Sequence, residues 1–326
     1  MIKELHGKSN IIVKVIADSI SGVDVRLTTF ELTYPRMIHS ELMTHRLFSR
    51  NAMSSRAVPI KTMIDLVRTA PAKPVEWGKN NAGMQSKSLL DPEMAQYVES
   101  EWETAAANAA RSAALMDTYG AHKQIANRLL EPFQMMRTIL TATDFANFFW
   151  LRVDADADPT IKEVATLMHE LYKTHEPETL ENGQWHTPYV DHYYDQNDDG
   201  TLTFAGYCVD NTPEDIELGA GPYKLLTQEE ALGISASCCA QVSYRRLDST
   251  KDKALSIYER LLSGNKVHAS PFEHQATPMR ETEDPMCSDD WDAGTTHVDI
   301  NGERWSGNLR EWVQHRQLLP NNVIGG

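Results

Sequence analysis

The amino-acid sequence predicts an α+β fold, on three observations. Residues 11–15 (IIVKV) and 24–34 (DVRLTTFELTY) are rich in β-branched and aromatic residues and alternate in part, as strands do. The middle of the chain, from about residue 91 to 171, has the composition and apolar spacing of helices. Residues 176–233 are rich in Asp, Gly, Pro and Tyr, which indicates irregular structure with short strands.

Composition excludes several classes of protein. The chain has 326 residues, 41% hydrophobic and 24% charged, as expected for one large domain or two modest ones. Its N-terminus (MIKELHGKSN) lacks the apolar core of a signal peptide and no apolar run is long enough to span a bilayer, so we expect a cytoplasmic protein with no membrane partner. A net charge of −15 disfavours nucleic acid as a partner, and the four cysteines lack the spacing of a zinc site.

The first half of the chain is expected to alternate helices with one long loop. Pro35 suits the first turn of a helix that runs to about Asn51. Residues 69–90 show no period, and we interpret them as a loop that covers a substrate. Asp91 and Pro92 then begin a long Ala-rich helix that ends at Gly120.

Further helices are expected downstream. One spans residues 122–140 with a kink at Pro132, and another opens with Thr160 and Glu163 as a capping box. Two more are predicted over residues 249–264 and 308–319. The change of composition near residue 180 predicts a division into 1–180 and 181–326, and we expect the two parts to form one intertwined catalytic unit. The buried face of the capping-box helix is expected to be Ile161, Val164, Ala165, Met168 and Leu171.

One short segment concentrates cationic and hydroxyl side chains. On a helix, Arg46 and Arg50 would stack four residues apart, and an anion between them would relieve their repulsion. Guanidinium groups suit phosphate because they donate two parallel hydrogen bonds. An anion site and a solvated basic helix face both remain open on this pattern. The members of the segment are His45, Arg46, Arg50, Asn51, Ser54, Ser55 and Arg56.

Two other patterns have both a chemical and a structural interpretation. Glu273 and His274 in SPFEH could be acid–base machinery or a turn with a satisfied histidine. Asn147 and Arg152 in NFFWLR lie in an apolar helix, where the arginine needs either a carboxylate or a ligand as its partner.

No metal site or nucleotide-binding glycine loop is predicted. Asp195, Asn197, Asp199 and Gly200 imitate the start of a calcium loop, but Gly206 stands where the bidentate Glu should be. Rossmann and Walker glycine patterns are both absent from the sequence, so side chains would have to hold a nucleotide.

Taken together, these segments resemble the flavin-dependent thymidylate synthases. The family signature is Arg-His-Arg, seven residues and then Ser; here Thr44-His45-Arg46 is followed by seven residues and Ser54. NRLLEP (127–132) and NFFWLR (147–152) are similar to the family's helical segment. AQVSY (240–244) and SPFEH (270–274) are similar to a block that precedes the signature in the family but follows it here.

The resemblance implies a family-like fold, a mixed sheet with a long-helix bundle, whose motif order is permuted. A partial duplication is the other interpretation, because Gln314-His315-Arg316 echoes the signature. That second copy would be structural or would complete a neighbouring site.

The resemblance also implies roles for individual residues. His274 would contact both the flavin and the reacting atoms, and Arg152 would favour ionisation at N3 of the pyrimidine and so raise electron density at C5. Ser54 would act in catalysis as well as in binding. The remaining flavin contacts would be His45, Arg46, Asn51 and Asn147, and the nucleotide contacts Ser54, Ser55, Arg56, Arg128, Arg152 and Glu41.

Two positions depart from the family pattern. Thr44 replaces the first Arg of the signature and Ala52 replaces a nucleotide-contacting Glu, so Glu41 or the WGKN loop would have to compensate. The family's Asn-x-Arg flavin contact is missing near residues 141–144.

The implied reaction converts dUMP to dTMP. 5,10-Methylenetetrahydrofolate would supply the carbon, FAD the hydride, and NADPH would reduce the flavin. A homotetramer with sites between subunits is implied as well. The alternatives are a dUMP or dCMP hydroxymethylase that shares these cofactors, and an inactive homologue that only binds the nucleotide.

Overall fold

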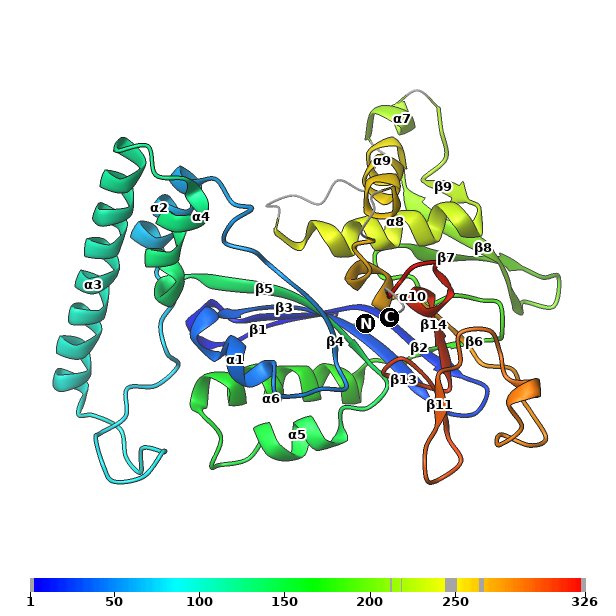
Figure 1. Ribbon diagram of the computed structural model, residues 1–326, viewed down its shortest axis with the longest axis horizontal. Helices are drawn as coiled ribbons and strands as arrows, with labels where there is room; N and C mark the ends of the chain where they lie inside the picture. Colours follow the sequence, from blue (N-terminus) through cyan, green and yellow to red (C-terminus); the bar gives the residue numbers. More distant parts are fainter. Residues whose placement is uncertain (1–2, 212, 218, 244–250, 264–266, 324–326) are drawn as a thin grey trace.

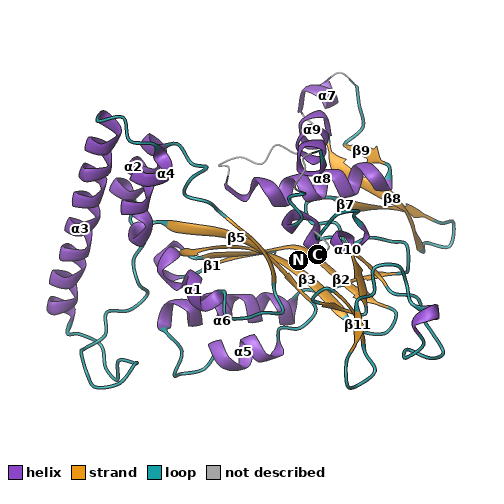
Figure 2. Cartoon of the chain, in the orientation of Figure 1, coloured by secondary structure: helices purple, strands orange, loops and turns teal. Residues whose placement is uncertain are grey.

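A twisted mixed sheet forms the centre of the molecule (Figures 1 and 2). The computed structural model describes residues 3–211, 213–217, 219–243, 251–263 and 267–323. The strands follow one another in the order β1-β2-β3-β5-β4, and β6 pairs in parallel with the end of β2. Their bounds are β1 (Glu4–His6), β2 (Ile12–Ser21), β3 (Arg26–Pro35), β4 (Ser49–Ala52), β5 (Met135–Ala142) and β6 (Glu178–Leu180).

The two strands predicted near the N-terminus are confirmed as β2 and β3. They pair antiparallel with a register shift between Val15 and Ala17. Alternation places Phe30 and Leu32 in one core, whereas Thr29 faces the opposite side of the sheet. The two faces of the sheet therefore differ: one is apolar and the other carries buried hydroxyl groups.

Helices α5 (Ala146–Arg152) and α6 (Pro159–Thr174) cover the apolar face (Figure 1). All five predicted core positions of α6 are buried, which confirms that face. The predicted capping box is wrong: the side chain of Asp158 caps the helix by accepting from the backbone N–H of Thr160 and Ile161. Glu163 instead accepts from the backbone N–H of Lys8.

A helical layer packs at one end of the sheet. It contains α2 (Ile60–Thr69), α3 (Pro92–Thr118), α4 (Lys123–Ala126) and the 3-10 segment η3 (Asn127–Phe133). Pro92 begins α3 and Gly120, with a φ of 79°, follows its end, so the predicted long helix is confirmed. Its Ala106, Ala110 and Ala113 pack in the same core as α2, where only small side chains allow close approach.

The loop between α2 and α3 is irregular, as predicted. Gly78 forms an isolated antiparallel bridge with Leu89, and the ring of Trp77 packs on Trp102 of α3 at 5.9 Å. The loop is thus tied to α3, and its role as a substrate cover stays a prediction.

Two predicted helices in the first half of the chain are wrong. Between Pro35 and Asn51 the chain forms η2 (Arg36–Ile38), the single turn α1 (His39–Leu42), a further turn and then β4. Residues 122–140 form α4, η3 and the first part of β5. In both places pairing with a neighbouring strand overrides local helix propensity: β5 pairs with β3 over eight residues and with β4 over four.

The C-terminal half covers the other face of the sheet (Figure 1). A three-stranded sheet, β7-β8-β9, packs on α8, whose Thr227–Glu230 capping box went unnoticed in the sequence. The elements are β7 (Asp191–Gln196), β8 (Leu202–Asp210), α7 (Pro213–Glu217), β9 (Tyr223–Leu226), α8 (Gln228–Ala240), η4 (Gln241–Ser243), α9 (Lys251–Leu262) and η5 (Ser270–Glu273).

The last elements are short. The predicted helix over 308–319 is wrong, because Trp312–Gln314 pairs with Ala276–Pro278 instead. The elements are β10 (Ala276–Pro278), η6 (Ser288–Asp290), β11 (His297–Val298), β12 (Arg304–Ser306), β13 (Leu309–Arg310), β14 (Trp312–Gln314) and α10 (His315–Leu318). The one remaining element, η1 (Lys8–Asn10), precedes β2.

The α+β fold class is confirmed by these elements. The predicted short strands within residues 176–233 are β6 to β9. The helix predicted over 249–264 is present as α9, although positions 249, 250 and 264 lie outside the described residues. Among the described helices, none is long and apolar enough to cross a membrane.

Candidate active site

Segments far apart in the sequence meet on β4, the strand that follows the His-Arg motif. The side-chain amide of Asn51 donates to the backbone carbonyl of Cys239 at 3.2 Å, just before η4. Ser49 Oγ lies 3.1 Å from Oδ1 of Asn308 and 3.3 Å from Nε2 of Gln314. The 3-10 turn η5, which holds most of SPFEH, also contacts β4. The signature strand therefore lies against η4, which belongs to AQVSY, and against η5 of SPFEH; Tyr244 lies outside the described residues.

Arg152 joins α5 to the signature turn. Its Nε donates to Nε2 of His45 at 3.1 Å, and its Nη1 lies 3.2 Å from Oε2 of Glu41. Its Nη2 reaches Oγ1 of Thr44 at 3.5 Å. A guanidinium has five N–H donors, so this arrangement fixes its plane and leaves donors for a ligand. Three of the predicted site residues, Glu41, His45 and Arg152, are thus brought together.

The electrostatics of this cluster keep His45 neutral. Burial, with help from the positive charges of Arg152 and Arg50, lowers the pKa of His45 to about 4. Burial and the nearby carboxylate of Asp158 raise the pKa of Glu41, against the effect of Arg152. The neutral His45 accepts at Nε2, so its proton is on Nδ1.

The signature turn is held from both sides. The ring of His45 packs edge-on against Phe148 of α5, with centroids 4.8 Å apart. Arg50 donates from Nη1 to the backbone carbonyls of Met43 and His45 at 3.0 and 3.2 Å. The prediction that Arg46 and Arg50 share a helix face is wrong, because Arg50 lies in β4 and its guanidinium organises the preceding turn.

A second polar cluster surrounds Glu131. Its Oε1 accepts from Oγ of Ser55 at 2.8 Å and lies 3.0 and 3.1 Å from guanidinium nitrogens of Arg128 and Arg36. The side-chain amide of Asn127 donates to the backbone carbonyl of Ser55 at 2.7 Å. Two predicted nucleotide residues, Ser55 and Arg128, therefore share a carboxylate that could give way to a phosphate.

The other predicted residues differ in exposure. Arg46, Arg56 and Asn147 are exposed, whereas Ser54 is half-buried. Asn51 is nearly buried against the end of α8. The exposed side chains present two guanidinium groups and an amide to the surface beside the signature turn and α5.

His274 is fully buried behind η5. Its Nδ1 lies 2.8 Å from Oγ1 of Thr141 on β5, and its Nε2 has no hydrogen-bond partner among the described residues. Burial lowers its pKa to about 3. The preceding residue, Glu273, forms an ion pair with Arg316, and burial raises the pKa of that carboxyl against the pull of Arg316. An orphaned buried nitrogen beside an ion pair marks a place where a ligand or water completes the structure.

Sequence reasoning missed Arg36, Glu131, Thr141 and Arg316 as members of these clusters. Arg316 had a signal, since it belongs to the Gln-His-Arg echo; its partner is the Glu of SPFEH. Thr141 gave none, because a threonine that directly follows a predicted helix carries no sign of the strand pairing that places it beside His274.

One comparison, with a family model, agrees with the resemblance over part of the chain. Residues 22–178 match the family model of the thymidylate synthase complementing protein. This segment is thus similar to that family. It contains β3, β4, β5 and α5, and with them Glu41, His45 and Arg152.

The solved structure of a UMP/dUMP methylase, PolB from Streptomyces cacaoi with bound 5-Br UMP, is similar to the chain with a TM-score of 0.39. It is 18% identical and covers 52% of this chain and 91% of its own. No curated protein matches the chain. The thymidylate synthase complementing family segment stops before η4 and η5, which the fold nevertheless places against β4.

Proposed function

We propose that this protein methylates C5 of a pyrimidine nucleotide, converting dUMP to dTMP as a flavin-dependent thymidylate synthase. The observation that carries the proposal is the Glu41–His45–Arg152 cluster inside the family segment. It unites the signature turn with the helix whose arginine the resemblance assigns to the pyrimidine.

Arg152 is the residue proposed to act on the base. Its guanidinium is half-buried and already oriented by His45 and Glu41, so a carbonyl or N3 anion of the base would meet fixed donors. Stabilising negative charge at N3 increases electron density at C5, the carbon that must be alkylated. The neutral His45 accepts a hydrogen bond from Arg152. Because His45 carries no positive charge, it does not compete with Arg152 for the anion.

The nucleotide phosphate is proposed to bind at the loop after β4. Ser55 and Arg128 already face a carboxylate oxygen of Glu131, so their donors are arranged for an anion. Arg56 is exposed on the same loop, and Ser54 precedes it. At this one place, two guanidinium groups and two hydroxyls would attract a phosphate although the chain as a whole has a net charge of −15.

The donor set supports a flavin as the redox cofactor. The exposed Arg46 and Asn147 are donors that could hold the carbonyls and diphosphate of FAD. Bound FAD would supply the hydride, NADPH its electrons, and 5,10-methylenetetrahydrofolate the carbon. The protein's own part is to orient the base through Arg152 and to position His274 through Thr141.

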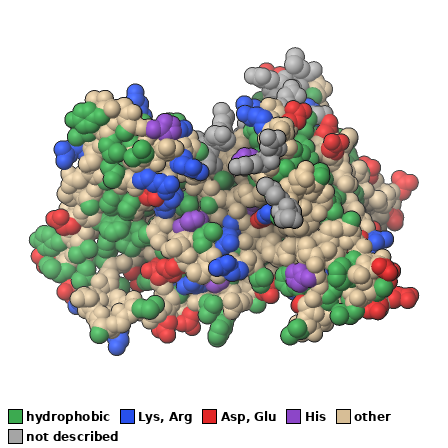
Figure 3. Space-filling view, in the orientation of Figure 1, with side chains coloured by type: hydrophobic (Ala, Val, Ile, Leu, Met, Phe, Trp, Pro, Cys, Tyr) green, Lys and Arg blue, Asp and Glu red, His purple; other side chains and the backbone are tan. Residues whose placement is uncertain are grey.

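A homotetramer is proposed as the assembly. Helix α3 exposes large apolar side chains, and Figure 3 shows hydrophobic side chains gathered at this end of the molecule. A surface of that kind is typical of a subunit contact. The exposed members on α3 and directly after it are Met94, Tyr97, Val98, Leu115 and Tyr119.

The test is anaerobic turnover of the purified protein with FAD, NADPH, methylenetetrahydrofolate and dUMP, with the products identified by mass spectrometry. We expect dTMP, lost in Arg152→Ala and strongly reduced in Arg56→Ala. Arg68→Ala, an exposed arginine on α2, is the matched control and should leave turnover unchanged. Hydroxymethyl-dUMP, or conversion of dCMP alone, would replace the proposal by the hydroxymethylase. Nucleotide binding without product from either substrate would mean an inactive homologue.

A further inference from the structure

A row of five buried polar side chains crosses the central sheet. Oγ1 of Thr29 lies 2.7 Å from Oγ1 of Thr141, its register partner on β5. Thr29 also lies 2.8 Å from Nε2 of His186, whose Nδ1 lies 2.8 Å from Oγ of Ser19. At the other end Thr141 reaches Nδ1 of His274 at 2.8 Å. The order is therefore Ser19, His186, Thr29, Thr141 and His274, each at most 2% exposed.

Counting hydrogens leaves this row two satisfied states. Each hydroxyl has one hydrogen and each neutral imidazole one N–H, so every interior member donates to one neighbour and accepts from the other. Either all hydrogens point toward His274 or all point away from it. A mixed arrangement would leave two hydrogens, or two lone pairs, facing each other in a buried place. Burial lowers the pKa of His186 and of His274 to about 3, so both imidazoles are neutral.

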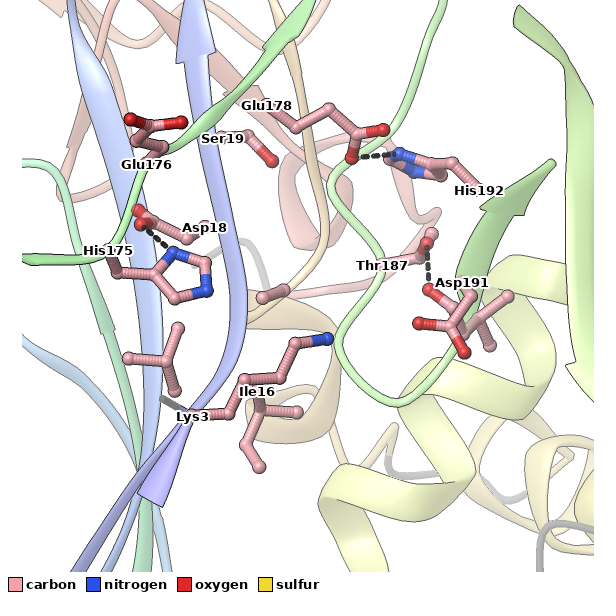
Figure 4. Close-up of a pocket in the computed structure, with 13 residues that line it drawn as sticks. Lys3, Ile16, Asp18, Ser19, His175, Glu176, Glu178, Thr187, Asp191 and His192 are labelled. Atoms are coloured by element: carbon pink, nitrogen blue, oxygen red, sulfur yellow. Dashed lines mark hydrogen bonds and ion pairs between the residues drawn. The ribbon is translucent and has the colours of Figure 1, made fainter. Parts of the chain in front are cut away.

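The two ends of the row differ. Ser19 lines a pocket of about 130 Å³ between β2 and the loop before β7 (Figure 4). Two contacts between a carboxylate and an imidazole flank it: Asp18 with His175 at 2.8 Å and Glu178 with His192 at 2.5 Å. At the opposite end Nε2 of His274 has no partner among the described residues. The row therefore connects an acid-lined pocket with the turn that completes the candidate site.

We propose that this row relays a proton from Nε2 of His274 to the pocket at Ser19. The proposal rests on the proposed function in one respect: replacing the C5 hydrogen of the base by a carbon group releases a proton, and the row gives it a route. Thr29, His186 and Ser19 act at a distance as positioning and relay residues.

The transfer balances along the row. Nε2 of His274 takes the incoming proton while its Nδ1 proton passes to Thr141. The proton of Thr141 passes to Thr29, and that of Thr29 to Nε2 of His186. Nδ1 of His186 gives its proton to Ser19, whose own proton leaves to water in the pocket. Each member loses one hydrogen and gains one, so the row ends uncharged with its hydrogens reversed.

The first experiment needs no turnover. In either satisfied state both imidazoles are the same tautomer: both Nδ1–H when the hydrogens point away from His274, both Nε2–H when they point toward it. ¹⁵N NMR of histidine-labelled protein should show His186 and His274 in matching tautomers, assigned with His186→Gln and Thr141→Val. Opposite tautomers, or a charged imidazole near neutral pH, would overturn the row itself.

The second experiment measures catalysis. Thr29→Val removes the central hydroxyl, and Thr29→Ser keeps it. We expect Thr29→Val to lower kcat about tenfold or more with little change in KM, and to abolish the curvature of the proton inventory in mixed H₂O and D₂O. Thr138→Val is the matched control, since Thr138 is equally buried on β5 but bonds to Tyr34.

Equal kcat values for Thr29→Val and Thr29→Ser would refute the relay, provided both fold as judged by circular dichroism. If Thr29→Val fails to fold, Ser19→Ala at the pocket end is compared with the parent protein in the same way. If the parent protein forms no dTMP, the proposed function fails, while the tautomer measurement still decides whether the row exists.

Discussion

Arg152 donates from Nε to Nε2 of His45 over 3.1 Å, although 107 positions separate the two residues in the chain. The bond ties α5 to the turn before β4. The bond to His45 uses one edge of the guanidinium, and Glu41 contacts another. A small change at Arg152 should therefore disturb the geometry of this cluster more than the stability of the fold.

Arg152→Lys should therefore be a catalytic and not a folding defect. Lysine keeps the charge but loses the planar fork, so we expect kcat/KM for dUMP to fall on the order of 100-fold. The ion pair with Glu41 is part-exposed, so the free energy of unfolding should change by less than about 1 kcal/mol. Steady-state kinetics and urea unfolding check the two halves, with Arg68→Lys as the control. A loss of stability without a loss of kcat/KM would reassign Arg152 to a structural role.

Acid should destabilise the fold through its neutral histidines. Burial lowers the pKa of His186 and of His274 to about 3 and that of His315 to about 4. The unfolded chain titrates near 6.5, so between about pH 6.5 and 4 it binds more protons than the folded chain. The free energy of unfolding should then fall as the pH falls, by up to about 1.4 kcal/mol per pH unit for each imidazole.

His315→Phe separates one of these contributions. His315 packs edge-on against Trp185 and Phe272, an environment that accepts another aromatic ring. Removing it should make the plot of unfolding free energy against pH less steep between pH 6 and 5. The difference should correspond to about one bound proton, or about 1.4 kcal/mol per pH unit. Urea denaturation at several pH values measures the slope. The same slope in both proteins would show that His315 is not held neutral.

Removing one partner of the Glu273–Arg316 ion pair should destabilise the fold more than replacing both partners. Arg316→Ala leaves the largely buried carboxylate of Glu273 without its guanidinium, at a cost of about 2 kcal/mol. Adding Glu273→Gln should recover much of that loss, because the uncompensated charge is then gone. Lys79→Ala breaks an exposed pair with Asp91 and should cost less than about 1 kcal/mol. Thermal unfolding of the four proteins tests this, and no recovery in the double variant would contradict it.

The apolar surface of α3 should control assembly. Replacing Tyr97 and Val98 by Glu puts charges on that surface, and we expect the proposed tetramer to dissociate in sedimentation velocity runs while α3 stays helical. Leu66→Glu, at an exposed apolar position on α2, is the control and should leave the sedimentation coefficient unchanged. An unchanged coefficient in the Tyr97/Val98 variant would place the subunit contact elsewhere.

Local signals predicted the parts of the fold that depend on local physics. The alternation of β2 and β3, the Asp91–Pro92 start of α3 and the apolar face of α6 are all present. The failures share one cause: β4, β5 and β14 are strands only because a partner strand lies beside them. Thr138, Ile139 and Thr141 have β-branched side chains that suit a strand, but Pro132 and the helical residues before it concealed the change of structure.

For the site, the family resemblance gave residue names and the fold supplied their partners. Glu41, His45 and Arg152 are together, as the resemblance implied, whereas Ser55 and Arg128 meet through Glu131, a carboxylate that no motif singled out. Thr141 and Arg316 depend on strand pairing and on a contact 43 positions away in the chain, and neither is visible in a single sequence.

Strand β4 ends the sheet, so only β5 supports it from within. Further contacts come from Cys239, η5, Asn308 and Gln314, all made late in synthesis. A nascent chain that has left the ribosome only as far as α6 could pair β2, β3 and β5, yet the strand that follows the His-Arg motif would still lack its cover. Assembly of the candidate site therefore waits for synthesis of the residues up to Gln314, so a chain that ends earlier would not contain the finished site.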